Sequence, residues 1–390
     1  MDPLENPYRP GAGARPPALT GRDGLIAEFA TAVAKTKAGR PGQSIIPIGL
    51  RGVGKTVLLN RFADDARAAG AHVAYLEAGE DRRFLQELAA AIRTLLLTYD
   101  RLGAVSQTVQ RALRVLRSFA VTIPGGVGFT VAVDPEVGVA DSGLLRRDLT
   151  DLLVATGQAA ADRHSCTLLA IDELQYLSED EFAAIIMALH RSVQLDLPIL
   201  LVGTGLPQLP ALAGEAKSYA ERLFAFPQIG SLDAASAREA IVEPARARGV
   251  DFTEGALALI LNRTHGYPYF LQEWAHDAWN QGSDNRVTEA DIIAIQGNVE
   301  HRLDRDFFTV RFDRLTPQER QYLRAVAHYG TIARSGEIAM ALHRKVESLA
   351  PVREALIRKG MLYSPEYGQT AFTVPLFDEF MKRALPMSAS

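Results

Sequence analysis

Short apolar runs alternate with longer segments of helical periodicity over roughly the first 230 residues of the chain. Thr167–Ile171 and Pro198–Val202 are short and apolar, as is Ile45–Leu50, which is typical of strands buried on both faces of a sheet. Val57–Ala69 and Arg82–Thr98 instead carry apolar residues at intervals of three and four, which predicts amphipathic helices. This alternation predicts an α/β fold with a parallel sheet and helices on both faces.

The pattern becomes purely helical after Asp233 and changes again after residue 312. Up to about Phe308, apolar residues recur at helical spacing, which predicts a small helical lid domain. From Thr316 to Leu385, three short helical patterns precede two short strands that flank a turn, and this order is that of a winged helix. We therefore expect a core with an N-terminal arm at 1–230, a lid at 231–312 and a winged helix at 313–390.

One stretch of the core departs from the alternation of strands and helices. Phe119–Val139 alternates apolar residues around two proline-containing turns, which predicts an inserted β-hairpin at about 119–139. The helical segment before it carries Arg111, Arg114 and Arg117 along one stripe. This stripe is either a solvated face or a contact for an acidic partner.

The strand Ile45–Leu50 runs into the pattern Gly49-x-x-x-x-Gly54-Lys55-Thr56, which is that of a phosphate-binding loop. Its glycines permit backbone torsions that other residues avoid, so that successive N–H groups turn towards phosphate oxygens at a helix N-terminus. Lys55 would contact the β- and γ-phosphates of ATP, and the Thr56 hydroxyl would ligate Mg²⁺. The residues expected to contact the nucleotide here are Gly49, Arg51, Gly52, Val53, Gly54, Lys55, Thr56 and Val57.

Two carboxylates follow the apolar strand Thr167–Ile171. Asp172 and Glu173 stand at its carboxyl end, where ligands bind in open α/β sheets. Asp172 would hold Mg²⁺, and Glu173 would polarise the water that attacks the γ-phosphate. Thr204, after the strand Pro198–Val202, would bond the γ-phosphate or that water, but its place beside two glycines suits a simple turn residue equally well. The loop and the carboxylates together predict Mg²⁺-dependent ATP hydrolysis.

Composition narrows the choice of compartment and partners. The net charge of −4 carries no overall nucleic-acid signature, so any DNA contact has to come from a local patch. The single Cys166 excludes an internal disulfide and fits a reducing compartment. The N-terminus lacks a signal-peptide pattern and the most apolar run, Leu197–Ala213, is interrupted by prolines, so we expect a cytoplasmic protein that does not span a membrane.

The segments GLRGVGKT, LLAIDELQ, ILLVGTG and SYAERLF, followed by helices and a winged helix, resemble the AAA+ class of ATPases. More narrowly, the chain resembles bacterial ATPases allied to the archaeal-ATPase, STAND-like and initiator-type (origin-recognition-like) branches. The resemblance implies a P-loop NTPase sheet of order 5-1-4-3-2 and makes Thr204 the sensor residue. It also implies that Arg222 is an arginine finger for the neighbouring subunit of a homo-oligomer. The alternative for Arg222 is a surface ion pair with Glu221 or Glu215.

The same resemblance points to residues outside the core motifs. Arg22 lies in a segment that resembles the one near adenine, together with the arm that contains Tyr8. The lid stretch from Gly266 to Gln272 lacks the arginine that initiator-type ATPases usually carry there. Its Pro268 resembles the proline that abuts the nucleotide in STAND-type lids, which favours a slow, nucleotide-gated switch, although proline also simply suits the first turn of a helix.

The C-terminal region is locally basic. Asp313–Ser390 contains eleven Lys and Arg against eight Asp and Glu. In the third predicted helix, Arg353, Arg358 and Lys359 are the candidate contacts to duplex DNA, as a recognition helix requires. Acidic residues share that helix, and winged helices also bind proteins.

Two hypotheses follow from these patterns. The first is an AAA+-type ATPase that couples ATP binding and hydrolysis to winged-helix engagement of DNA. The second is a STAND-like signalling switch, gated by ATP and ADP, whose winged helix contacts protein and not nucleic acid.

Overall fold

The computed structural model describes residues 1–390 except 12, 80, 82, 102–105, 129–132 and 387–390. The chain forms two compact units. The sheet unit comprises Asp23–Ile48 and Lys55–Gln228, and the helical unit comprises Met1–Arg22, Gly49–Gly54 and Ile229–Ser390. The N-terminal arm, grouped with the core on sequence grounds, thus belongs to the helical unit. Within the part of the chain that the structure describes, no helix has the length and apolarity needed to cross a membrane.

The sheet unit contains a five-stranded parallel sheet of order β2-β3-β4-β1-β5. From the other edge this order is 5-1-4-3-2, so the predicted sheet is confirmed. The interior strand β3 pairs on both sides, with Leu169 opposite Ala74 of β2 and Leu201 of β4. The strands are β1 (Ser44–Ile45), β2 (His72–Glu77), β3 (Thr167–Asp172), β4 (Ile199–Gly203) and β5 (Phe224–Ala225).

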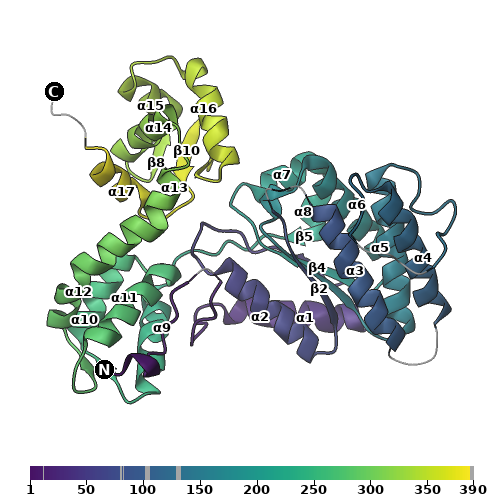
Figure 1. Cartoon of the computed structure of the whole chain (residues 1–390), viewed down its shortest axis with the longest axis horizontal. Helices are drawn as coiled ribbons and strands as arrows, with labels where there is room; N and C mark the ends of the chain where they lie inside the picture. Colours follow the sequence, from purple (N-terminus) through teal and green to yellow (C-terminus); the bar gives the residue numbers. More distant parts are fainter. Residues whose placement is uncertain (12, 80, 82, 102–105, 129–132, 387–390) are drawn as a thin grey trace. The chain divides into compact units, whose positions relative to one another are not determined.

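Helices cover both faces of this sheet, as parallel strands require because their connections must cross over. α1 and α2 lie on one face, α3, α5 and α6 lie on the other, and α4 packs outside α3 and α5 (Figure 1). The helices are α1 (Asp23–Lys37), α2 (Lys55–Ala68), α3 (Phe84–Arg101), α4 (Gln107–Thr122), α5 (Leu145–Asp162), α6 (Glu179–Gln194), α7 (Leu209–Ala216) and α8 (Ala220–Leu223), with a short 3₁₀ turn η2 (Leu174–Tyr176).

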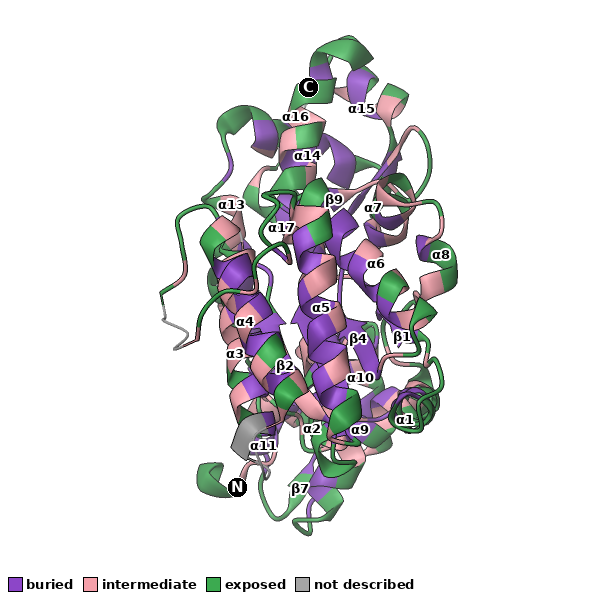
Figure 2. Cartoon of the chain, turned by 90° about the vertical axis from the view of Figure 1, so that its right-hand side faces the viewer, coloured by how far each residue is buried: buried purple, intermediate pink, exposed green. Residues whose placement is uncertain are grey.

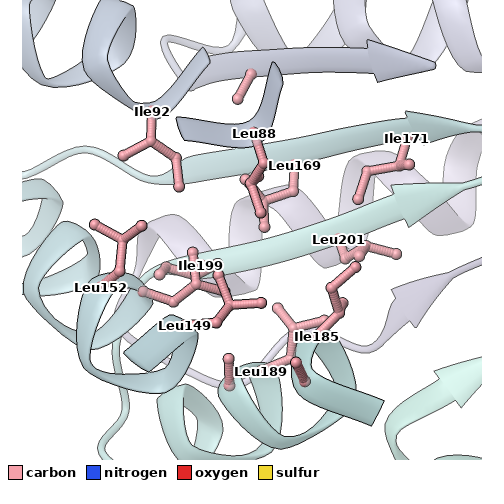
Figure 3. Close-up of a cluster of buried hydrophobic side chains, with 14 of the residues drawn as sticks. Leu88, Ile92, Leu149, Leu152, Leu169, Ile171, Ile185, Leu189, Ile199 and Leu201 are labelled. Atoms are coloured by element: carbon pink, nitrogen blue, oxygen red, sulfur yellow. The ribbon is translucent and has the colours of Figure 1, made fainter. Parts of the chain in front are cut away.

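The core of the sheet unit forms where β3 and β4 meet the helices above them. Leu169 and Leu201 are each 1% exposed and lie among leucine and isoleucine side chains from α3, α5 and α6 (Figure 3). Every residue of β3 is buried, whereas buried and partly exposed residues alternate along α5 in the manner of an amphipathic helix (Figure 2). This packing holds the carboxyl end of β3, and with it Asp172, in a fixed place.

The predicted hairpin at 119–139 is wrong. Phe119 lies inside α4, and the described residues after that helix, 123–128 and 133–139, contain no strand. Residues 129–132 of the predicted hairpin lie outside the described residues. Leu116, Phe119 and Ile123 are all buried, so the apparent alternation is the continuation of a helical stripe.

The arginine stripe on α4 has a partner within the chain. Glu136 accepts hydrogen bonds from Arg111 (3.3 Å) and Arg114 (2.8 Å), and these bonds lower the pKa of Glu136. Two of the three arginines are thus already paired with an acidic group of the same unit.

The N-terminal arm packs into the helical unit. The ring of Tyr8 is 2% exposed, packs edge-on against Phe252 and Trp279, and its hydroxyl donates to the carbonyl of Ile241. The elements of this part are η1 (Pro3–Glu5), α9 (Ala234–Arg246), β6 (Asp251–Phe252), α10 (Glu254–Thr264), α11 (Pro268–Gln281), β7 (Arg286–Val287), α12 (Glu289–Arg302), the π-helical turn η3 (Leu303–Thr309) and α13 (Val310–Phe312).

The C-terminal part contains three helices and then a hairpin, in the order that the sequence predicted. An additional strand, β8, pairs with β10 and makes a three-stranded antiparallel sheet of order β8-β10-β9. Leu323, Leu356 and Phe377 are fully buried between these elements. The elements are α14 (Pro317–His328), β8 (Ile332–Arg334), α15 (Ser335–Ala341), α16 (Val346–Arg358), β9 (Leu362–Tyr363), β10 (Gln369–Phe372) and α17 (Phe377–Ala384).

Candidate functional site

Three neighbouring strands of the sheet unit end in polar groups at the same edge. Glu77 closes β2 opposite Asp172 of β3, and Thr204 follows β4. Because parallel strands present their carboxyl ends at one edge, residues more than 30 positions apart are brought together there.

Asp172 is the centre of this group. Its side chain is buried, and its Oδ2 accepts a hydrogen bond of 2.7 Å from the hydroxyl of Thr56. Its Oδ1 accepts bonds from the hydroxyl of Thr204 and from the backbone N–H of Glu173, the latter at 3.0 Å. Donors from the start of α2, the end of β4 and the chain after β3 therefore hold one carboxylate in a single orientation.

The oxygens of Thr56 and Asp172 suit a magnesium ion. Mg²⁺ prefers oxygen ligands and usually takes only one or two from the protein, the others coming from water and phosphate. The two predicted ligands are in direct contact, so the donor set fits the ion.

Glu173 follows Asp172 in an unusual backbone conformation. Its φ of 55° and ψ of 44° lie in the left-handed region, which is uncommon for a residue with a side chain and recurs at functional sites. Its N–H also contacts the Thr204 hydroxyl at 3.2 Å, so the turn is tied to the end of the neighbouring strand β4. Its carboxylate accepts a hydrogen bond from the amide of Gln175.

Glu77 is a site residue that sequence analysis missed. Partial burial, together with the charges of Asp172 and Glu173, raises the pKa of Glu77 above its ordinary value. The available signal was the implied sheet order 5-1-4-3-2, in which strand 2 lies next to strand 3, the strand of Asp172. Gln175 was missed as well, because only the folded backbone brings its side chain to Glu173.

The phosphate-loop pattern is divided between the two units. In the sheet unit, Lys55 begins α2 and is buried. In the helical unit, Gly52 and Gly54 have φ of 82° and 89°, which confirms that these two positions need glycine for their torsions. Gly49 is different, since a Cβ there would lie 2.2 Å from the carbonyl of Ile229. Close approach of the backbone, and not a positive φ, requires glycine at 49.

The remaining loop residues have the following places. Val53 is almost fully buried, whereas Arg51 and Val57 are partly exposed. Within the helical unit, the N–H of Arg51 donates to the carbonyl of Thr373 (2.9 Å) and the carbonyl of Gly52 accepts from the N–H of Tyr269 (3.2 Å). Pro268, the residue before Tyr269, is the first residue of α11. The residue after Pro268 is thus bonded to the glycine loop, and the contact of Pro268 with a nucleotide stays a prediction.

Two residues of the N-terminal arm have other contacts than those expected. The buried Tyr8 side chain belongs to the core around α9 and α11, so its ring and hydroxyl are not available to a nucleotide. The guanidinium of Arg22 donates to the carbonyl of Gly230, and burial lowers its pKa while nearby Asp233 opposes that shift.

The candidate macromolecular contacts differ in exposure. Arg222 is exposed on α8 and Arg358 is exposed near the end of α16. Arg353, however, donates to Thr370 and Ser364 and to the carbonyl of Gln369. Arg353 therefore joins α16 to the hairpin.

Lys359 also has partners within the helical unit. Its ammonium group bonds the carboxylate of Glu319 (2.8 Å) and the carbonyl of Arg314 (3.1 Å). Of the three predicted DNA contacts, Arg353 and Lys359 are thus engaged within their own unit.

Residues 18–202 match the family model of the AAA ATPase domain, and residues 305–381 match a domain of unknown function (DUF8462). No curated protein matches the chain. Among solved structures, the Walker-type ATPase PABY2304 of Pyrococcus abyssi is 15% identical, with 96% of this chain and 98% of that chain covered and a TM-score of 0.54.

Two further solved structures are similar at lower scores. The Aeropyrum pernix ORC1 protein, solved in complex with DNA, is 15% identical, with 94% of each chain covered and a TM-score of 0.47. The Thermotoga maritima RuvB Holliday junction branch migration motor is 15% identical, with 97% of this chain and 100% of that chain covered and a TM-score of 0.45.

The family match and the strand order agree with one another. Residues 18–202 are similar to the AAA ATPase domain, and the five-stranded parallel sheet has the order expected for a P-loop NTPase. The similarity to the P. abyssi ATPase concerns the fold.

Proposed function

We propose that this chain binds ATP with Mg²⁺ and hydrolyses it, and that the nucleotide state governs a winged helix formed by its C-terminal part. The observation that carries the hydrolytic part is the convergence of Thr56, Thr204 and the N–H of Glu173 on Asp172. Phosphoryl transfer requires a hydroxyl from the phosphate loop, a fixed carboxylate and a polar group at a strand end, and here these three groups are in contact.

Each residue has one task in this proposal. Lys55 offsets the charge of the β- and γ-phosphates, and Thr56 and Asp172 hold the metal ion. Bound Mg²⁺ would withdraw charge from the phosphate oxygens. Glu173 accepts a hydrogen bond from the attacking water and orients it, and Thr204 holds Asp172 and the Glu173 turn in place.

The hydrolytic part is tested with two substitutions. Lys55→Ala should lose nucleotide binding, measured with a fluorescent ATP analogue. Glu173→Gln should keep binding and lose steady-state phosphate release by about 100-fold, which is within the usual range for a general base. Glu239→Gln, an exposed position on α9, is the control for the change of charge. Wild-type phosphate release by Glu173→Gln would refute the role given to Glu173.

Coupling to the C-terminal part is supported by the bonds of the glycine loop within the helical unit. Arg51 bonds to Thr373, which directly follows β10, and Gly52 bonds to Tyr269 at the start of α11. A loop that rearranges around phosphates has to change or break these bonds. Nucleotide binding therefore acts on the lid helix and on the C-terminal sheet together.

The proposed output is contact with duplex DNA. The C-terminal part has more basic than acidic residues, and Arg344, Lys345 and Arg358 are exposed at the two ends of α16. Such side chains suit phosphate contacts, with the N-terminal turn of the helix nearest the groove. An Arg222 finger in a homo-oligomer belongs to the same proposal, since its exposure on α8 leaves it accessible to a neighbouring subunit.

A protein partner is the second candidate for the output. Arg353 and Lys359 are engaged within their own unit, while Met340 near the end of α15 and Val346 at the start of α16 expose apolar side chains. An exposed apolar face suits a protein surface better than a phosphate backbone. This favours the nucleotide-gated switch.

Titration of fluorescent duplex at several salt concentrations separates the two candidates. A DNA binder should lose affinity steeply with salt, and Arg358→Ala should reduce the slope of log K against log salt by about one. Arg191→Ala, on the exposed end of α6, is the matched control. No duplex binding with or without ATP would refute the DNA output and favour a protein partner.

A further inference from the structure

Gln175 uses both ends of its side-chain amide at the candidate site. It lies in the turn η2, two residues after Glu173. Its Nε2 donates to Oε2 of Glu173, and its Oε1 accepts from the backbone N–H of Leu206 at 3.1 Å. Leu206 follows Thr204 in the segment between β4 and α7. One side chain therefore joins the carboxylate of Glu173 to the segment after β4.

The backbone of Glu173 is held independently of this side chain. Its N–H contacts Oδ1 of Asp172 and the hydroxyl of Thr204, and its left-handed conformation sets the direction in which the side chain leaves the chain. The rotation of the carboxylate about its own bonds is what these contacts leave undetermined. The amide of Gln175 reaches the carboxylate itself and restricts that rotation.

We infer that Gln175 is a positioning residue, which orients the carboxylate of Glu173 and makes that orientation depend on the segment from Thr204 to Leu206. The inference rests on the proposed hydrolytic role of Glu173. The chemistry fits the residue type, because the amide side chain of glutamine offers a donor to a carboxylate and, on a separate atom, an acceptor to an N–H. Asparagine is one methylene shorter and glutamate lacks the donor.

A purely structural role for Gln175 would rest on its hydrogen bond with Leu206 alone. The side chain of Leu206 is 1% exposed, and Oε1 of Gln175 serves its N–H, so Gln175 would then matter only as an acceptor that keeps the β4–α7 segment in place. The substitution Gln175→Glu distinguishes the two roles. It preserves the length and the acceptor for Leu206 but removes the donor to Glu173, whereas Gln175→Ala removes both.

The experiment measures three quantities for each variant of the full chain. These are kcat and KM for ATP turnover, affinity for a fluorescent ATP analogue, and hydrogen exchange of the Leu206 amide in nucleotide-free protein. A positioning role predicts that both variants lose about tenfold or more in kcat, with nucleotide affinity unchanged within about twofold. Exchange at Leu206 should accelerate in Gln175→Ala and remain at the wild-type rate in Gln175→Glu.

Two further proteins complete the design. Gln194→Glu, at the exposed end of α6, makes the same chemical change away from the site and should keep wild-type turnover. In a Glu173→Gln background, Gln175→Glu should cause no additional loss of turnover, because residues that act as a unit are not additive.

The outcomes separate this inference from the proposed function. Wild-type protein without ATP turnover, or unchanged turnover in Glu173→Gln, refutes the proposed function and the inference with it. If wild-type protein is active, Glu173→Gln is not, and Gln175→Glu keeps the wild-type kcat, the proposed function stands and the positioning role is overturned. An additive loss in the double variant overturns it as well.

Discussion

The hydroxyl of Thr204 should contribute measurably to the stability of the sheet unit. Its side chain is fully buried, donates to Oδ1 of Asp172 and contacts the N–H of Glu173. Thr204→Val replaces the hydroxyl with a methyl group of similar size and leaves the backbone bonds of residue 204 to Ile171 and Leu174 intact. The substitution is therefore confined to the side-chain hydrogen bonds.

The expected loss of stability in Thr204→Val follows from the charge of the acceptor, the carboxylate of Asp172. A hydrogen bond to a charged group contributes about 1.5–3 kcal/mol, against about 0.5–1.5 kcal/mol for a neutral pair. Thr156→Val is the matched control, because this equally buried hydroxyl donates only to the neutral carbonyl of Leu152 at 2.8 Å. A domain of this size loses roughly 2–4 °C per kcal/mol, so Thr204→Val should lower the melting temperature by about 3–12 °C.

Thermal unfolding of nucleotide-free protein, followed by circular dichroism, measures both variants. Thr204→Ser, which keeps the hydroxyl, should lie between wild type and Thr204→Val. The reasoning would be refuted if Thr204→Val melted at the same temperature as Thr156→Val. That result would mean that the hydrogen bond to the Asp172 carboxylate contributes no more to stability than the hydrogen bond to a neutral carbonyl.

Three further predictions concern other parts of the chain. Gly49→Ala should weaken nucleotide binding and lower the melting temperature, because the added Cβ meets the carbonyl of Ile229 at 2.2 Å; a wild-type value of both would contradict the close approach. Leu169→Ala should lower the free energy of unfolding in urea by about 2–5 kcal/mol, since the side chain is 1% exposed and its loss leaves a cavity in the core. Cys166 is 1% exposed, and burial raises the pKa of its thiol to about 11. A thiol reagent should therefore label the native protein far more slowly than the unfolded protein at pH 8. Labelling of the native protein should become faster as the pH rises towards that pKa.

The local pattern of apolar residues was sufficient to predict those helices and strands that bury a stripe or a run of side chains. The strands that contain Leu169 and Leu201 were predicted because their apolar runs are visible without any partner. The hairpin at 119–139 was predicted wrongly for a related reason. A helix that nears its end with Phe119 and Ile123 buried looks, over so few residues, like an alternating strand.

Side-chain contacts between distant segments were not predictable in the same way. Tyr8 was expected near a nucleotide, but its ring completes a core with Phe252 and Trp279. The basic character of Arg353 and Lys359 was visible in the sequence, whereas their acceptors were not. Charge is a property of the residue, but its availability depends on which groups the fold brings within bonding distance.

The sequence by itself determined which chemical groups the candidate site contains: a glycine loop with Lys55 and Thr56, and a strand followed by two carboxylates, Asp172 and Glu173. Tertiary structure decided how those groups meet. Pairing of β3 with β2 and β4 brings Glu77 and Thr204 beside Asp172, and the left-handed turn at Glu173 brings the amide of Gln175 to its carboxylate. The physical reason is that periodicity along a chain encodes which face of an element is buried, whereas the neighbours of a buried polar group are set by strand order and register.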